Sequence, residues 1–265
     1  MKYKDLLLEK EGGIATITLN VPDKLNAFTN DMRISLPLAA DEVARDDDVK
    51  VVILTGAGRG FCSGADVRRQ AANIAGEVVD TSRQARIEVV GGLANVFPGL
   101  NKPVIAAVNG PCVGMGFSIA LSCDIRIASE AARFGAVFIL RGLAPDTGIT
   151  HFLPTVVGMS KALELMFTGE VIGAAEAERL GIVSRIVPPD ELMNTARELA
   201  AKIAQQAPIP IELTKKIVWR SSLGDLTRQL DLETYAQNIC RQTEDHRESV
   251  RAFLEKQPQP QFKGR

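Results

Sequence analysis

Two glycine-rich segments give this sequence its clearest capacity for chemistry. One, residues 55–67, follows an apolar run at residues 51–55, and the other, around Gly114 and Gly116, follows an apolar run at residues 103–108. Glycines between a strand and a helix let a ligand approach the backbone closely, and the first N–H groups of a helix have no partner inside it. Two such loops could direct two backbone donors at one oxygen. This is an oxyanion hole, in which each donor can stabilise developing charge by about 3–4 kcal/mol.

The same segments also allow plainer interpretations. A glycine turn can be purely structural and bind nothing. Residues 103–123 carry no charge, which would suit a membrane span, but Asn109-Gly110-Pro111 divides the run and the mean hydropathy of the chain is only +0.05. Neither segment fits the phosphate-binding pattern G-x-x-x-x-G-K-[ST] or the dinucleotide-binding pattern G-x-G-x-x-G.

Together with PDKLNAF at residues 22–28 and the later pattern FxxxxxxxGLAPDTG, the two loops resemble the crotonase (enoyl-CoA hydratase/isomerase) superfamily. The resemblance extends from Leu6 to about Phe262. It implies an α/β fold with a crotonase-like repeated β-β-α spiral core at residues 1–200, which carries the CoA-ester site. It also implies a C-terminal helical subdomain for trimerisation at residues 201–265.

The resemblance further implies the substrate and its position. The carbonyl oxygen of a CoA thioester would lie between the backbone N–H groups of Ala65 and Met115. The family usually has glycine where this chain has Met115, but the donor is a backbone group, so methionine can serve and its side chain would narrow the pocket. The positions that match substrate-binding positions of the family are Lys24, Ala27, Ser63, Asp66, Val67, Gly114, Phe138, Phe253 and Lys256.

Three of these positions carry further expectations. Lys24 could pair with a CoA phosphate, or it could be an ordinary solvated lysine in a turn. Phe253 and Lys256 match family positions that reach the CoA of a neighbouring subunit.

Carboxylates are scarce where the family usually has them. Hydratases of the superfamily carry two glutamates, which would fall at Ser118 and Phe138, and neither residue is acidic. Ser118 could hold a water, but it is a poor base without a partner and is equally explained as an ordinary helix serine. Asp146 stands where isomerases of the family have a base and aryl-CoA dehalogenases a nucleophile, although its neighbours also suit a helix N-cap. The histidine of the dehalogenases is absent, because the chain has Gly91 at that position.

A single carboxylate is enough to move a double bond. Asp146 would remove the α-proton and return it at C4, while the two N–H groups stabilise the enolate oxygen, provided that burial raises the pKa of the carboxyl group. We therefore predict isomerisation of an enoyl-CoA. The alternatives are enoyl-CoA hydration, hydrolysis or dehalogenation of an aryl or cyclic acyl-CoA in the same pocket, and a catalytically silent protein that binds CoA esters.

The composition argues against other classes of function. A formal net charge of −1 and a pI of about 6.2 disfavour nucleic acid as a partner. The four cysteines and two histidines show no metal-binding spacing. We expect no metal and no permanently bound cofactor, with coenzyme A entering as part of the acyl-CoA substrate. The N-terminus lacks a signal-peptide pattern, so we expect a cytoplasmic protein without membrane contact, and the resemblance implies a homotrimer or a hexamer built as a dimer of trimers.

The elements that must position these residues follow from periodicity and turn signals. We predict strands at residues 14–19, 51–55, 103–108, 124–128 and 182–187, with a turn at residues 22–26. Residues 82–97 favour a helix, and the resemblance implies a mobile loop over the acyl pocket in the segment that begins at Arg68. We expect Asp124 to be structural and His151 to be a packed or exposed helix residue.

Helix signals are strongest at caps and towards the C-terminus. Thr29 or Asn30 can cap a helix that reaches Arg45, with a kink or a late start at Pro37. Ser160 can cap a helix that Gly169 ends. Further helices are predicted at residues 117–121, 174–180, 190–203, 211–219, 226–239 and 247–254.

Overall fold

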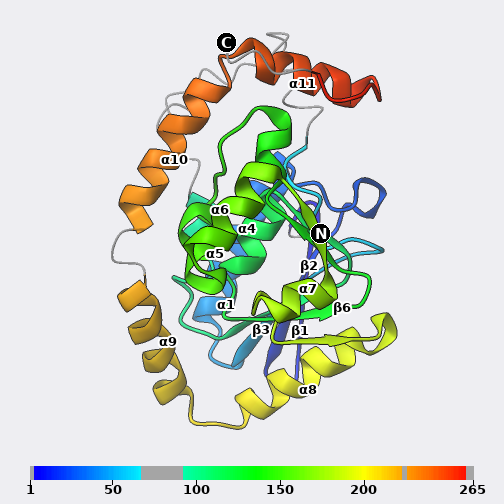
Figure 1. The fold of residues 1–265 in the computed structure, drawn as a ribbon. Helices are drawn as coiled ribbons and strands as arrows, with labels where there is room; N and C mark the ends of the chain where they lie inside the picture. The colour runs from blue at the N-terminus through cyan, green and yellow to red at the C-terminus, as the bar shows by residue number, and fades with distance from the viewer. Residues whose placement is uncertain (1–2, 67–91, 223–225, 261–265) are drawn as a thin grey trace.

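The computed structural model describes residues 3–66, 92–222 and 226–260 (Figure 1). Val67, Gly91 and the part of the predicted loop and helix at residues 68–91 lie outside the described residues. The described chain forms a mixed α/β core, and its C-terminal helices run along the outside of that core (Figure 1).

Six strands form the main sheet in the order β1-β2-β3-β4-β6-β9. β1 runs antiparallel to β2, and the other neighbours pair in parallel. The four predicted strands at residues 14–19, 51–55, 103–108 and 124–128 are confirmed. The predicted strand at residues 182–187 is shorter, because the Ile182 N–H still bonds to the Ala177 carbonyl as the chain leaves a helix. The bounds are β1 Leu6–Glu11, β2 Ile14–Leu19, β3 Val51–Gly56, β4 Val104–Val108, β6 Ile125–Ser129 and β9 Arg185–Val187.

A second sheet of three short strands has the order β5-β7-β8. Its strands are β5 Pro111–Val113, β7 Arg133–Gly135 and β8 Val171–Gly173. The chain passes from β4 to β5 and then into helix α4 (Met115–Leu121), and from β6 to β7 and then towards helix α5 (Ile149–Val157). Each turn of this spiral contributes one strand to each sheet and then a helix, which confirms the predicted β-β-α core.

The helices mostly confirm the predicted ones, with two corrections. α1 begins at Asn30, with Thr29 capping the Met32 N–H, so the late start predicted at Pro37 is wrong. α6 begins at Met159 with Gly158 as its N-cap and no side-chain cap, so Ser160 does not cap it, whereas Gly169 ends it as predicted. The remaining helices are α7 Ala174–Arg179, α8 Leu192–Ala204, α9 Pro208–Ser222, α10 Leu226–Cys240 and α11 Glu244–Leu254, and the short 3-10 helices are η1 Pro22–Lys24, η2 Gly92–Asn95, η3 Val137–Arg141 and η4 Pro189–Glu191.

The central strands β3 and β4 are buried on both faces of the sheet, which explains their uninterrupted apolar runs. On one face Ile53 and Ile105 pack against Leu192 of α8. On the other face Leu54 and Val104 belong to the larger core that α1 and α4 share. Alternating side chains of each central strand are therefore apolar on both sides, and no charged residue interrupts them.

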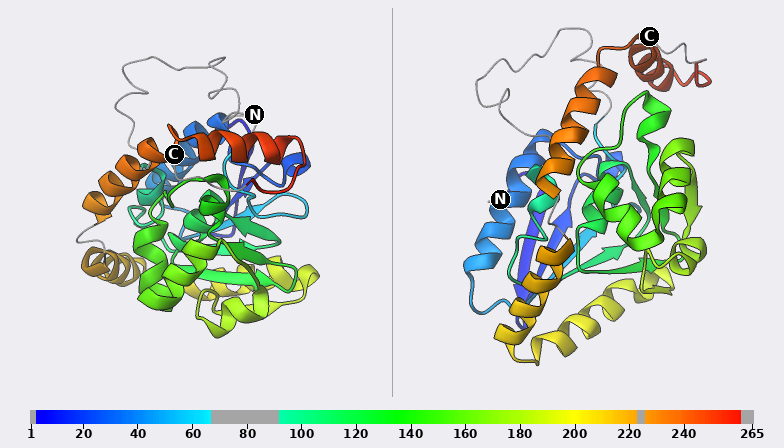
Figure 2. Two further views of the ribbon diagram at one scale, coloured as in Figure 1. Left: turned by 45° about the horizontal axis from the view of Figure 1, so that its top comes forward. Right: turned by 60° about the vertical axis from the view of Figure 1, so that its left-hand side comes forward.

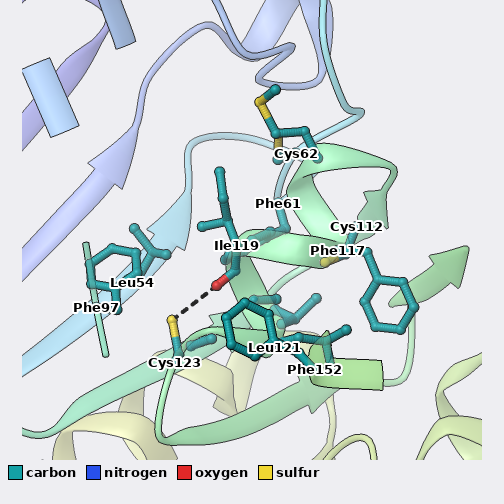
Figure 3. Packing of buried hydrophobic residues seen from close by; sticks show 14 of the residues in the cluster. Leu54, Phe61, Cys62, Phe97, Cys112, Phe117, Ile119, Leu121, Cys123 and Phe152 are labelled. Carbon is teal, nitrogen blue, oxygen red and sulfur yellow. Dashed lines mark hydrogen bonds between the residues drawn. The ribbon is translucent and has the colours of Figure 1, made fainter. Parts of the chain in front are cut away.

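Buried cysteines contribute to the larger core. Figure 3 shows Cys62, Cys112 and Cys123 among aromatic and aliphatic side chains, with the Cys123 thiol donating to the Ile119 carbonyl at 3.4 Å. Burial raises the pKa of Cys62 to about 12. A thiol with such a pKa stays protonated at neutral pH, so Cys62 serves as a small packing residue.

The C-terminal helices α9, α10 and α11 follow one another along the outside of the core (Figure 2). α9 is attached through Asp124, which accepts hydrogen bonds from Lys215 Nζ at 2.7 Å and Trp219 Nε1 at 2.5 Å. Asp124 also accepts from the Val104 N–H at 2.6 Å, so its structural partners are distant in sequence rather than local. The predicted boundary at residue 200 falls inside α8, and the division into two domains stays a prediction. Within the described ranges, no helix is both long and apolar enough to cross a membrane.

Candidate active site

The two glycine-rich loops meet in space. Cys62 and Cys112 form a parallel bridge, and the Val113 N–H donates to the Cys62 carbonyl at 3.0 Å. Their approach is so close that a Cβ atom added to Gly64 would lie 3.2 Å from the Val113 carbonyl oxygen and 3.9 Å from the Met115 nitrogen. The juxtaposition that the sequence could only suggest is therefore present.

Glycine is required on both sides of this contact. Gly64 has φ +93° and Gly114 has φ +55°, which are values that favour glycine. Gly116 lies against the backbone of Cys62, where an added Cβ would be 2.5 Å from the carbonyl oxygen. Since the nearest atom is backbone, it cannot easily move away.

The backbone donors at the junction are available. Met115 is the first residue of α4, and the bonds that close the first turn run from the Phe117 and Ser118 N–H groups to the Gly114 carbonyl. Within the described residues, neither the Met115 nor the Ala65 N–H donates a hydrogen bond. The Met115 side chain is buried. The arrangement can therefore offer two N–H groups to one acceptor oxygen.

Four of the predicted CoA-binding residues lie together beside Ala65. Lys24 Nζ forms an ion pair with Asp66 Oδ2 at 2.9 Å, and the Ser63 hydroxyl donates to the Lys24 carbonyl at 3.0 Å. The Ala27 N–H donates to the same carbonyl at 3.1 Å. Lys24 is thus an exposed lysine whose ammonium group is paired with Asp66, and its contact with a CoA phosphate stays a prediction.

Asn26 holds this turn in place and was missed by the sequence analysis. Its fully buried side chain accepts from the Val21 N–H at 2.8 Å and donates to the carbonyls of Ala57 at 2.9 Å and Gly60 at 2.7 Å. It joins the turn after η1 to the glycine-rich loop after β3. The available signal was an asparagine inside the turn PDKLNAF. Asn26 adopts a positive φ of 54°, which asparagine tolerates better than most residues with a side chain.

Asp146 is the buried carboxylate of the site. Its side chain is 5% exposed, and its Oδ1 and Oδ2 accept from Thr147 Oγ1 at 2.9 Å and Gln237 Nε2 at 2.7 Å. Burial raises the pKa of Asp146 above its usual range. It does not cap α5, because the N-cap is Gly148, so the N-cap interpretation is wrong.

Ser118 connects Asp146 to the loop junction. Ser118 lies on α4 three residues after Met115, is fully buried, and its hydroxyl is 3.1 Å from the Asp146 carbonyl oxygen. It therefore links α4 to the backbone that carries the carboxylate. The same helix supplies a backbone donor at its first residue and support for the carboxylate one turn later.

The predicted residues of the C-terminal half are placed differently. Phe138 is buried in η3, where its carbonyl accepts from the Leu143 N–H at 3.2 Å. Phe253 lies on α11, with its ring 4.0 Å from the Arg141 guanidinium carbon, and Lys256 is exposed just beyond that helix. In the described chain α11 packs on η3. Contact of these two residues with a neighbour's CoA stays a prediction.

Glu233 is a second buried carboxylate that the sequence analysis did not single out. It accepts from the Gly148 N–H at 2.8 Å, the Thr150 N–H at 3.2 Å and the Thr150 hydroxyl at 2.6 Å. Burial raises the pKa of Glu233 to about 7. The charge of Asp146 adds to this rise, and the three hydrogen bonds oppose it. The available signal was its spacing from Leu230, which places it on the buried face of an amphipathic helix.

Other places in the described chain offer no competing site of this kind. Within residues 3–66, 92–222 and 226–260, no group of three or more His, Cys, Asp or Glu is placed to hold a metal ion. A cavity of about 490 Å³ lies between α9 and residues 95–101, and none of the candidate site residues lines it. His151 packs edge-on against Phe152, with ring centres 5.5 Å apart, which fits the predicted packing role.

Comparison with known proteins agrees with this geometry. Residues 9–265 match the family model described as enoyl-CoA hydratase/isomerase. The chain is 40% identical to a short-chain-enoyl-CoA hydratase from Clostridium acetobutylicum, over 100% of both chains. It is 37% identical to a 1,2-epoxyphenylacetyl-CoA isomerase from Escherichia coli, over 98% of both chains. The solved structure of a monofunctional enoyl CoA isomerase from M. smegmatis superimposes with a TM-score of 0.70 at 38% identity, covering 82% of this chain and 93% of that one.

A β-β-α spiral core in which two glycine-rich loops meet defines the crotonase fold. The chain belongs to the enoyl-CoA hydratase/isomerase family. It is an enzyme that acts on an acyl-CoA thioester.

Proposed function

We propose that this enzyme moves the double bond of a 3-enoyl-CoA to C2 and uses Asp146 as its single acid/base. The observation that carries the proposal is the position of Asp146, buried and bonded through Ser118 to the helix that begins with the Met115 donor. No second acidic side chain stands at Ser118 or Phe138.

The proposed reaction is a proton shuttle. The thioester oxygen accepts hydrogen bonds from the Ala65 and Met115 N–H groups, which lowers the cost of forming an enolate. Ionised Asp146 removes a proton from C2, the electron pair delocalises onto the thioester oxygen, and the protonated Asp146 returns the proton at C4. The double bond is then conjugated with the carbonyl group. A raised pKa suits Asp146 to both proton removal at C2 and proton return at C4. The reason is that the protonated carboxyl group is more stable than that of an ordinary aspartate.

The rest of the site would bind coenzyme A. We propose that CoA enters as part of the substrate, with no permanently bound cofactor, and that the cluster of Lys24, Ala27, Ser63 and Asp66 contacts it. Within this cluster the Lys24 ammonium would have to exchange its ion pair with Asp66 for a CoA phosphate.

We further propose a homotrimer, or a dimer of trimers, acting in the cytoplasm. Support for assembly comes from large apolar side chains that the C-terminal helices expose in the single chain. On α9 these include Ile209 and Ile217, and on α10 they include Leu232, Tyr235 and Ile239. In such an assembly Phe253 and Lys256 would reach a neighbour's CoA.

Hydration is the second candidate, and the name of the Clostridium relative favours it. The geometry favours it less. Ser118, which stands at one family glutamate position, already directs its hydroxyl towards the Asp146 and Gly114 carbonyls, at 3.1 and 3.4 Å. It is therefore not placed to activate a water as well.

The test is mass spectrometry of 2-enoyl-, 3-enoyl- and aryl-CoA esters after incubation with the enzyme in heavy-oxygen water. We expect a product of unchanged mass whose double bond has moved from C3 to C2. A product heavier by one heavy water would establish hydration instead. Heavy oxygen in a released acid or in a ring hydroxyl would establish hydrolysis or dehalogenation, and tight binding without any product would mark a silent CoA-ester binder.

A further inference from the structure

Helix α10 turns an unusual face towards the core. Figure 1 shows α10 running beside α5, and the two helices are in contact. Gln237 and Glu233 are buried on the inner side, at 1% and 4% exposure, while Leu232, Tyr235 and Ile239 are exposed. A helix normally buries its apolar side chains, so polar contacts with the segment around Asp146 fix which face of α10 points inward.

The contact of Gln237 is with the proposed base itself. Its Nε2 donates to Asp146 Oδ2 at 2.7 Å, from 91 residues further along the chain. The Thr147 hydroxyl donates to the other carboxylate oxygen, Asp146 Oδ1, at 2.9 Å. Within the described residues, Gln237 Oε1 is a buried acceptor without a hydrogen-bond partner. The one hydrogen bond that orients this buried amide is therefore the bond to Asp146.

We propose that Gln237 is a positioning residue, whose amide N–H holds the carboxylate of Asp146 in the ionised form that accepts the substrate proton. This inference rests on the proposed role of Asp146 as the proton carrier. A hydrogen bond from an amide N–H is stronger to a charged carboxylate oxygen than to the carbonyl oxygen of a neutral carboxyl group, so the bond favours the ionised state.

The charges around Asp146 agree with this role. Burial alone raises the pKa of Asp146, and the donors Thr147 and Gln237 oppose that rise. Arg241, just after α10, and Arg33 of α1 act in the same direction as the donors. Glu233, on α10, is the opposing charge that faces the group. Gln237 therefore belongs to a set of residues that keep a buried acid able to ionise.

Glu233 keeps α10 in register for this contact. Gly148 offers no side chain to cap α5, and Glu233 accepts from the N–H groups of Gly148 and Thr150 in its place. Gln237 lies four residues later, one turn along the same face. The α10–α5 contact thus delivers Gln237 to Asp146.

The test compares Gln237→Met with Asn238→Met. The first removes the buried donor at nearly constant volume, and the second makes the corresponding amide-to-thioether change on the exposed side of α10. Two quantities are measured: the pKa of Asp146, from the carbon-13 shift of labelled aspartate carboxyls assigned with Asp146→Asn, and the pH profile of kcat/KM.

In Gln237→Met we expect the Asp146 pKa to rise by about one unit, with the acid limb of the kcat/KM profile moving by the same amount. Below that limb kcat/KM should fall about tenfold. Asn238→Met should leave both quantities unchanged. Gln237→Leu, which also removes the donor and adds no charge, serves if the methionine variant does not fold, and it should raise the Asp146 pKa by a similar amount.

An Asp146 titration that is the same in folded Gln237→Met, or in Gln237→Leu, as in the wild type would overturn the inference. Failure of the proposed function looks different, because Asp146→Asn would then keep its turnover. In that case the titration would still decide whether Gln237 controls the charge on Asp146.

Discussion

The loop junction and the Asp146 region hold their functional groups in different ways. At the junction the candidate donors are backbone N–H groups of Ala65 and Met115, and glycines bring the two chains together. Around Asp146 the functional groups are side chains, and Gln237 reaches the carboxylate from 91 residues away. The first region depends on backbone shape, and the second on the identity of each side chain.

This difference predicts how each region tolerates change. A backbone donor survives a change of side chain, which is why methionine can stand at position 115, but the junction leaves no room for a Cβ atom at Gly116. The Asp146 region has the opposite property. There each change of side chain alters the charge or the hydrogen bonds of the carboxylate.

The largest expected effect comes from Asp146→Asn. The amide keeps the shape of the side chain and an oxygen for Gln237 Nε2, but it cannot accept the substrate proton. We expect kcat to fall by about 10²–10⁴-fold while the Kd of a CoA ester, measured by calorimetry, stays within about twofold. Asp190→Asn, at an exposed position in η4, is the matched control. Turnover above a tenth of the wild-type value would contradict the assignment.

At the junction, Gly116→Ala should cost both activity and stability. The added Cβ would stand 2.5 Å from the Cys62 carbonyl and 2.6 Å from its Cβ, so the two loops must separate. We expect kcat/KM to fall by about 10²–10³-fold and the free energy of unfolding in urea to fall by about 1–3 kcal/mol. Gly173→Ala is the control, because its Cβ would meet nothing within 4 Å. Equal behaviour of the two variants would show that the junction tolerates separation.

Glu233 makes the stability of the Asp146 region depend on pH. Its pKa is raised from 4.5 to about 7, so between these values the folded protein holds a proton that the unfolded chain has released. The free energy of unfolding should therefore fall as the pH rises through this window, by at most about 3 kcal/mol. Urea titrations of Glu233→Gln should show a flatter dependence, whereas the exposed control Glu198→Gln should keep the wild-type slope. A wild-type stability that rises from pH 4.5 to 7 would contradict the burial argument.

The smallest effect is expected for Ser118→Ala. The variant loses the bond to the Asp146 carbonyl, which should lower the free energy of unfolding by about 1 kcal/mol and kcat/KM by a few-fold. The product spectrum in heavy-oxygen water should not change. Ser160→Ala, exposed on α6, provides the comparison. If hydration activity existed and vanished in Ser118→Ala alone, Ser118 would act on water after all.

Local patterns were sufficient for most of the core. The runs at β3 and β4 predicted buried strands, because a strand covered on both faces has no position for a charge. Thr29 and Gly169 predicted helix ends, since capping depends only on adjacent backbone groups. Ser160 does not cap α6, which begins one residue before it. At Pro37 the late start is wrong, because the packing of Leu36, Ala39 and Ala40 carries α1 through the proline, and the alternative of a kink stays a prediction.

The sequence alone determined the fold class, the two glycine loops and the single carboxylate at Asp146. Those features lie in residue type and short spacing. Only the tertiary structure decided that Gly64 lies against Val113 and Gly114. It also decided that Ser118 bonds to the Asp146 carbonyl, and that Gln237 and Glu233 face inward. The physical reason is that these contacts join segments up to 91 residues apart. On α10 the usual rule fails as well, because hydrogen bonds to buried groups outweigh the burial of Leu232, Tyr235 and Ile239 in the single chain.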